Sequence, residues 1–191
     1  MAPHSNAELD EPAVEPLTEL PTTDSGSDAE NEKMTDEEVT MWYSATYRRG
    51  SANPMKEPLT ASWGVPISDA DVEKLKVGFQ SRSMDDKWNI LIEDPDENGN
   101  LSIHIIRSWL QEECYILHIV PKPSNDEGGS AKIESITWEG NKAGLQCDVE
   151  QAQKEAVILC RGHLKCELEA LPHYPGWMFW DSSAYKKLDA E

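Results

Sequence analysis

The sequence predicts an α+β fold, in which a single antiparallel meander sheet of about four strands is flanked by helices and preceded by a disordered acidic tail. Four short runs with strand-like patterning follow one another between residues 88 and 138, and short connections favour antiparallel neighbours. Helix-start signals at Ser68 and Asp148 each precede apolar residues at helical spacing. Residues 1–40 contain twelve acidic residues and a single lysine.

The acidic segment is expected to be a tail outside the domain. Residues 1–34 contain four prolines and few apolar side chains. Such a segment cannot bury enough apolar surface to offset the entropy lost on ordering. We therefore expect 1–34 to be disordered and 35–191 to form a single α+β domain.

A short amphipathic helix is predicted over residues 36–49. Thr35 and Glu38 have the spacing of a capping box, and Gly50 suits the left-handed position after the helix. Its apolar and aromatic stripe consists of Val39, Trp42, Tyr43 and Tyr47. This stripe packs either on the core of its own domain or, in a second interpretation, on a partner protein.

Residues 51–67 contain three prolines and are predicted to be an irregular connector. Ser68 and Asp71 then begin a helix that runs to Gly78. The four predicted strands cover residues 88–93, 101–109, 114–120 and 132–138. Asn98-Gly99 supplies the positive φ of a hairpin turn between the first two strands.

A last helix is predicted from Asp148, which caps it together with Gln151. Gly162 interrupts this helix, which either ends there or continues to about residue 170. The aromatic segment 173–185 is expected to fold back onto the domain. The helices are expected to cover one face of the sheet.

Charge and composition exclude several classes of function. The 191 residues carry 36 acidic and 17 basic side chains, for a net charge of −19. This surface disfavours nucleic acid and anionic lipid, which require clustered lysine and arginine. No run approaches the roughly 20 apolar residues of a membrane span, and the first residues lack the pattern of a signal peptide. We expect a cytoplasmic or nuclear protein whose four cysteines are free thiols.

The sequence offers no familiar catalytic or metal motif, and we expect no catalytic residue, no metal and no cofactor. Cys160, His163 and Cys166 are spaced by three residues, which on a continuous helix prevents all three from reaching one ion, with or without Cys147. Cys114 and His118 share one face of a strand but lie roughly 13 Å apart at about 3.3 Å per residue. His104 is expected to be a partly buried strand residue.

The residues chosen as a candidate binding site lie in two segments, SRSMDDKWNI at 81–90 and RSW at 107–109. If the first two strands form a hairpin, Arg107 returns toward Asp85 and Asp86 and forms an ion pair shielded by tryptophans. This pair is either a structural salt bridge or part of a polar pocket for a planar or anionic ligand. The candidate binding residues are Arg82, Asp85, Asp86, Lys87, Trp88, Arg107 and Trp109.

These two segments resemble a family of small, mainly bacterial proteins with no established activity. The matching residues are Met84-Asp85-Asp86-Lys87-Trp88, then Arg107-Ser108-Trp109 and, more loosely, Cys114-Tyr115-Ile116. The resemblance covers about 60 residues, with a looser extension through the last helix, and it implies kinship without implying a function. Ile106 stands where the family has histidine, and Leu110-Gln111 stands where it has Thr-Gly.

Two functions are compatible with these observations. The first is a small non-catalytic binding or accessory module that engages a protein partner. The second is an enzyme or small-molecule-binding protein that uses a tryptophan-lined polar pocket around Asp85, Lys87, Arg107 and Trp109. An open cavity facing Arg107 favours the second function, whereas groups held at a closed surface favour the first.

Overall fold

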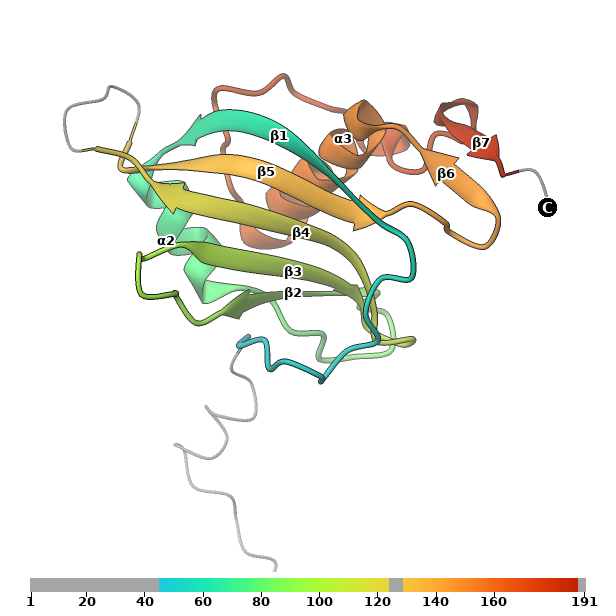
Figure 1. Ribbon diagram of the computed structural model, residues 1–191, viewed down its shortest axis with the longest axis horizontal. Coiled ribbons are helices and arrows are strands. Elements are labelled where there is room, and N and C mark those ends of the chain that lie inside the picture. Colours follow the sequence, from blue (N-terminus) through green and yellow to red (C-terminus); the bar gives the residue numbers. More distant parts are fainter. Residues whose placement is uncertain (1–44, 124–128, 189–191) are drawn as a thin grey trace, which may run out of the picture. The chain divides into compact units, whose positions relative to one another are not determined.

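A computed structural model describes residues 45–123 and 129–188, and its main feature is a five-stranded antiparallel sheet (Figure 1). The strands lie in the order β1-β5-β4-β3-β2. Their bounds are Pro58–Ile67 for β1, Trp88–Glu93 for β2, Leu101–Arg107 for β3, Glu112–Pro121 for β4 and Ala131–Glu139 for β5. The predicted α+β class and the meander of β2 to β5 are confirmed, but the sheet has five strands rather than four.

The fifth strand, β1, occupies most of the segment that was predicted to be an irregular connector. It pairs with β5 only, so it is an edge strand whose outer backbone groups need no partner in the sheet. This position tolerates Pro58 and Pro66, which lack an N–H donor. Gly64, at φ +73°, lies in an irregularity between Ser62 and Val65. The prolines therefore mark an edge strand instead of a loop.

Two helices lie behind the sheet in Figure 1, α2 over Asp69–Val77 and α3 over Val149–Leu159. Both predicted caps are confirmed, because Ser68 accepts a hydrogen bond from Asp71 N and Asp148 accepts one from Gln151 N. A π-helical turn, Cys160–Leu164, follows α3 and ends at Lys165, at φ +59°. The last helix therefore stops close to Gly162 and does not reach residue 170.

The core lies between the sheet and these helices. The inward faces of the strands contribute mostly isoleucine and leucine, and α3 contributes small and branched residues. The largest side chains that are almost fully enclosed are Tyr115, Ile67, Leu75, Ile90, Ile103, Ile105, Ile106, Leu117, Ile119, Ile133, Ile136 and Leu168. Within the described ranges, no helix is long and apolar enough to cross a membrane.

The helix predicted over residues 36–49 is wrong where the structure describes it. Residues 36–44 lie outside the described residues, and 45–49 are not helical. Tyr47 N donates to the carbonyl of Ile92, and Ile92 N donates to the carbonyl of Ala45. These bonds satisfy the outer edge of β2, so pairing with the sheet replaces the local helical pattern.

The C-terminal segment folds back onto the domain, as the sequence predicts. It consists of two short 3₁₀ turns, η2 (Gly176–Met178) and η3 (Ser182–Ala184), followed by β7 (Tyr185–Lys187). β7 pairs with β6 (Leu145–Cys147) in a second, two-stranded sheet. Phe179 packs edge-on against Trp88, with ring centroids 5.7 Å apart. The aromatic C-terminal segment thus covers the beginning of β2.

Candidate functional site

The loop before β2 meets the end of β3, as the hairpin predicts. Ser108 N donates to the carbonyl of Lys87 at 3.1 Å, and Ser108 Oγ donates to the carbonyl of Asp86 at 2.6 Å. Trp109 Nε1 donates to the carbonyl of Met84 at 3.2 Å. Ser108 and Trp109, rather than Arg107, therefore join the two segments.

The ion pair predicted between Arg107 and Asp85 or Asp86 is wrong. Asp86 Oδ2 instead accepts hydrogen bonds from the backbone N–H groups of Arg82, at 2.8 Å, and Ser83, at 3.1 Å. The Arg82 N–H is the largest of the influences that lower the pKa of Asp86. Asp85, Lys87 and Arg82 have exposed side chains on the same loop. The carboxylate nearest the strand thus holds the loop closed.

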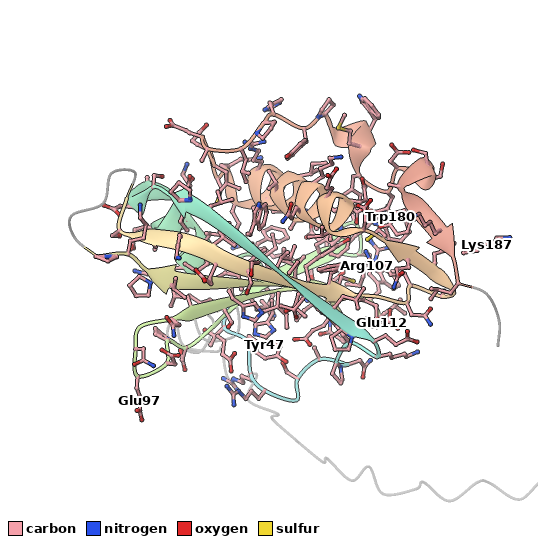
Figure 2. All side chains as sticks on the ribbon, turned by 45° about the horizontal axis from the view of Figure 1, so that its top comes forward. Tyr47, Glu97, Arg107, Glu112, Trp180 and Lys187 are labelled. Atoms are coloured by element: carbon pink, nitrogen blue, oxygen red, sulfur yellow. The ribbon has the colours of Figure 1, made fainter. Side chains whose placement is uncertain are left out.

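Arg107 is held by aromatic rings. Its Cζ atom lies 4.8 Å from the ring centroid of Trp88 and 5.7 Å from that of Trp180. Trp88 is buried, whereas Trp180 is 52% exposed. Figure 2 shows Arg107 and Trp180 next to each other, with Glu112 nearby and Tyr47 farther away. We call Arg107, Trp88 and Trp180 the arginine stack.

Among residues 45–123 and 129–188, the guanidinium of Arg107 has no ion-pair partner, because no carboxylate oxygen lies within 4.0 Å of its nitrogens. Glu112 is its register partner on β4 but makes no such contact. In the same part of the chain, no buried side-chain nitrogen or oxygen lacks a hydrogen-bond partner. The donors of Arg107 therefore reach solvent.

Trp180 contacts Arg107 while its own backbone is in a strained conformation. Its φ is +59°, which is unfavourable for a large side chain and costs on the order of 1–3 kcal/mol. The backbone N–H of Trp180 donates to Glu155 Oε1 at 3.1 Å, and this hydrogen bond stabilises the conformation. Strain of this kind persists only where surrounding contacts hold it, so the position of the Trp180 indole is built into the fold.

The anchor is a buried polar network that sequence reasoning missed. Glu155 is fully buried on α3, and Tyr185 Oη, at 2.7 Å, and Gln151 Nε2, at 2.8 Å, also donate to its Oε1. Tyr115 Oη donates to Oε2, and Lys142 Nζ lies 3.5 Å from the same oxygen. Glu155 follows Ala152 by three residues and Gln151 by four, so it lies on the same face of the helix as these residues. An acidic residue on that inward face was the sequence signal that could have predicted a buried polar network.

The titratable groups around the network are not activated for nucleophilic chemistry. Burial raises the pKa of the Cys114 thiol to about 11, in spite of the positive charges of Lys142 and Arg107. Burial and the nearby Glu155 carboxylate raise the pKa of Tyr115 and Tyr185 well above the usual range. At neutral pH these groups are protonated hydrogen-bond donors.

A second polar cluster surrounds His104, away from the arginine stack. Its Nδ1 lies 2.6 Å from Glu113 Oε1 and its Nε2 lies 3.3 Å from Glu93 Oε2, while the ring of Tyr47 stacks on it at 3.6 Å. Burial raises the pKa of Tyr47 to about 12, with a further contribution from Glu113. Burial opposes ionisation of Glu93, but hydrogen bonds from Arg49 and His104 outweigh it and lower its pKa. His104 is a strand residue, as expected, but it is buried rather than partly buried, and it has two carboxylate partners.

The cysteines and histidine considered for zinc have other surroundings. In the part of the chain that the structure describes, no three histidine, cysteine or acidic side chains are placed to hold a metal ion. Burial raises the pKa of Cys166 to about 12 and that of Cys160 further, and it is the main cause of the raised pKa of Cys147. His163 packs on Phe79, with ring centroids 4.7 Å apart.

His163 makes the stability of the domain sensitive to pH. Burial lowers its pKa from the ordinary value of 6.5, so the folded state favours the neutral ring. A depressed pKa contributes stability that is present above pH 6.5 and lost as the pH falls. We expect His163→Phe to reduce the fall in unfolding free energy between pH 7 and pH 5, measured by urea denaturation. An unchanged slope would contradict this.

A cavity of about 420 Å³ lies apart from these clusters. It is lined by Pro66, Ser68, Asp69, Gly129, Glu169 and Ala170. None of the seven candidate binding residues lines this cavity, which is formed by the end of β1, the start of α2 and two later loops. The arginine stack lies at the opposite end of the sheet, where β3 ends and β4 begins.

Comparisons with known proteins do not extend the argument. No family model, no curated protein and no solved structure matches this chain.

Proposed function

We propose that this protein is a non-catalytic binding module that holds a protein partner against the surface formed by Met84, Trp109 and Leu110, beside the arginine stack. We call these three residues the Trp109 surface. Kinship with the family described above is part of the proposal. In this chain Ser108 and Trp109, which belong to the shared segments, fasten the loop before β2 to the end of β3.

The observation that carries the proposal is the presentation of Trp109. Its side chain is 61% exposed, although its only polar atom already donates to the carbonyl of Met84. What remains exposed is therefore the apolar face of a fixed indole. Met84, whose carbonyl holds this indole, and Leu110, the next residue in the chain, also have exposed side chains. Exposed apolar patches of this kind mark interaction sites, and tryptophan and arginine are the residues that dominate binding energy in protein interfaces.

The chemistry of the neighbouring groups supports a binding module over an enzyme. The pKa of the Cys114 thiol is about 11, so this thiol is not a thiolate nucleophile at neutral pH. Asp86, one of the candidate binding residues, is engaged by the backbone of its own loop. Trp88 is buried, but the other candidate residues are exposed or half-buried at the surface, which favours a partner protein over an enclosed small molecule.

The proposal can be tested without a known partner, by selecting peptides of twelve residues from a random library on the immobilised full chain. We expect selected peptides to bind with micromolar dissociation constants by calorimetry. Trp109→Ser should weaken this binding at least tenfold, because truncating a central interface tryptophan commonly costs 2 kcal/mol or more. The urea midpoint should stay within error of the wild type, since Trp109 is mostly exposed.

Val77→Ser is the matched control, because Val77 is 75% exposed but belongs to α2 and not to the Trp109 surface. It should leave peptide binding unchanged. Peptides that bind equally well to wild-type protein and Trp109→Ser would overturn the proposal, as would a library that yields no specific binder.

A further inference from the structure

We propose that Arg107 is the binding site for one carboxylate group, supplied by the partner as an acidic side chain or a chain terminus. This inference rests on the proposed function for the source of the carboxylate. The site itself is defined by the arginine stack, so it can be tested independently of any partner.

The donors of the Arg107 guanidinium are not used within the described part of the chain. Arg107 is positioned by the rings of Trp88 and Trp180, and a contact through a ring face uses no N–H group. Across the described ranges, no protein acceptor takes a hydrogen bond from the guanidinium of Arg107. The planar fork is therefore oriented in advance and left with its donors available, which is the geometry that binds a carboxylate in a bidentate way.

The positive charge of Arg107 is not matched by a neighbouring carboxylate among the residues that the structure describes. Lys142 belongs to the neighbouring Glu155 network, and its Nζ is already matched by Glu155 Oε2 at 3.5 Å. Arg107 thus supplies a single unmatched positive charge in a chain whose net charge is −19. One such charge suits a monoanion, whereas a phosphate dianion would be left half neutralised beside Glu112, the register partner of Arg107.

Trp180 forms a fixed apolar wall beside the guanidinium. The backbone of Trp180 has a φ of +59°, and its backbone N–H donates a hydrogen bond to the buried Glu155 carboxylate. The result is an indole that is 52% exposed and lies against the guanidinium. Strained backbone conformations are retained where a particular geometry is needed, and here the strain places the Trp180 indole beside the unpaired guanidinium of Arg107. A carboxylate attached to an apolar or aromatic group fits this combination.

The experiment compares three probes on the isotope-labelled full chain, using the side-chain Nε–H signal of Arg107 and the indole N–H signal of Trp180. The probes are benzoate, its neutral isostere benzamide, and phenylphosphonate. We expect benzoate to shift both signals with a millimolar dissociation constant and benzamide to shift neither. Phenylphosphonate should bind at least threefold more weakly than benzoate.

Three variants complete the test, with the Trp180 signal as the readout. Arg107→Met should abolish the benzoate shift, and Arg107→Lys should weaken binding at least fivefold, because it keeps the charge but loses the fork. Arg48→Met, which removes an exposed arginine outside the site, should bind like the wild type. Because no carboxylate pairs with Arg107 in the described ranges, Arg107→Met leaves no buried charge behind and should lower the urea midpoint only slightly, through the loss of the two ring contacts.

Equal shifts with benzamide would overturn the proposal, and so would tighter binding of phenylphosphonate or retention of benzoate by Arg107→Met. The two proposals fail separately. Peptides that depend on Trp109, together with no benzoate shift at 50 mM, would leave the binding module standing and remove the carboxylate site. A benzoate shift without any selected peptide would do the reverse.

Discussion

Replacing Glu155 with leucine should lower the free energy of unfolding by about 3–5 kcal/mol, because it removes the common acceptor of a buried network. The carboxylate is fully buried and receives hydrogen bonds from Tyr185, Gln151 and the backbone of Trp180. Its loss also leaves the ammonium of Lys142, whose side chain is 15% exposed, without its counter-ion. Urea denaturation followed by tryptophan fluorescence measures the change.

The matched control is Glu150→Gln on the same helix. Glu150 is exposed and lies 4.0 Å from Lys154, so its replacement should change the free energy by no more than about 0.5 kcal/mol. Glu155→Gln keeps the shape and one oxygen and should fall between the two. Adding Lys142→Met and Tyr115→Phe to Glu155→Leu should recover part of the loss, since no charge is then left alone. A loss below 1 kcal/mol for Glu155→Leu would show that the network is dispensable.

The same variant connects stability to the arginine stack. Glu155 fixes the N–H of Trp180, so its removal allows the backbone at that position to relax from φ +59°. We expect Glu155→Leu to increase hydrogen exchange in residues 176–185 more than in β3 or β4. If exchange rises equally everywhere, the network stabilises the whole domain without holding the C-terminal segment in particular.

Local signals in the sequence predict the parts of the fold that local chemistry decides. Ser68 and Asp148 cap α2 and α3, and Gly99, at φ +78°, turns the chain between β2 and β3. β2 has the predicted bounds because its apolar run is interrupted by no competing turn signal. Caps and tight turns depend on a few adjacent residues, which is why one sequence suffices to locate them.

Pairings between distant segments could not be predicted in this way. β1 forms a strand because β5 offers it an edge to pair with, and its two prolines give no sign of that partner. The chain at Ala45 and Tyr47 is extended because it pairs with Ile92, against its local helical pattern. Long-range pairing overrides propensity at both places.

The candidate site shows the same limit. The hairpin correctly predicts that residues 84–87 meet 107–109. The sequence does not reveal that the Asp86 carboxylate accepts hydrogen bonds from backbone N–H groups of its own loop instead of pairing with Arg107. Trp180 is more than 70 residues away from Arg107 in the sequence, and its contact depends on a backbone conformation that tryptophan rarely adopts. Only the folded chain brings these residues together.

Asp71→Ala should be the second most destabilising change, at about 2–4 kcal/mol. Asp71 is almost fully buried at the start of α2, where Oδ1 accepts from Glu167 N at 2.7 Å and Oδ2 accepts from Leu168 N at 2.9 Å. Leu168 itself has a φ of +49°, so this carboxylate holds a strained turn after the π-helical segment against α2. Alanine would leave two backbone donors without acceptors in a region that water reaches poorly.

Two further variants separate this clamp from ordinary surface charge. Asp71→Asn keeps one oxygen acceptor and should lose about half as much free energy as Asp71→Ala. Glu73→Gln changes an exposed acid on the same helix, whose ion pair with Lys76 is open to solvent, and should cost no more than about 0.5 kcal/mol. The unfolding free energies come from urea titrations at pH 7. If Asp71→Ala proved as mild as Glu73→Gln, the turn at Leu168 would be held by packing alone, and the two hydrogen bonds would contribute nothing net to stability.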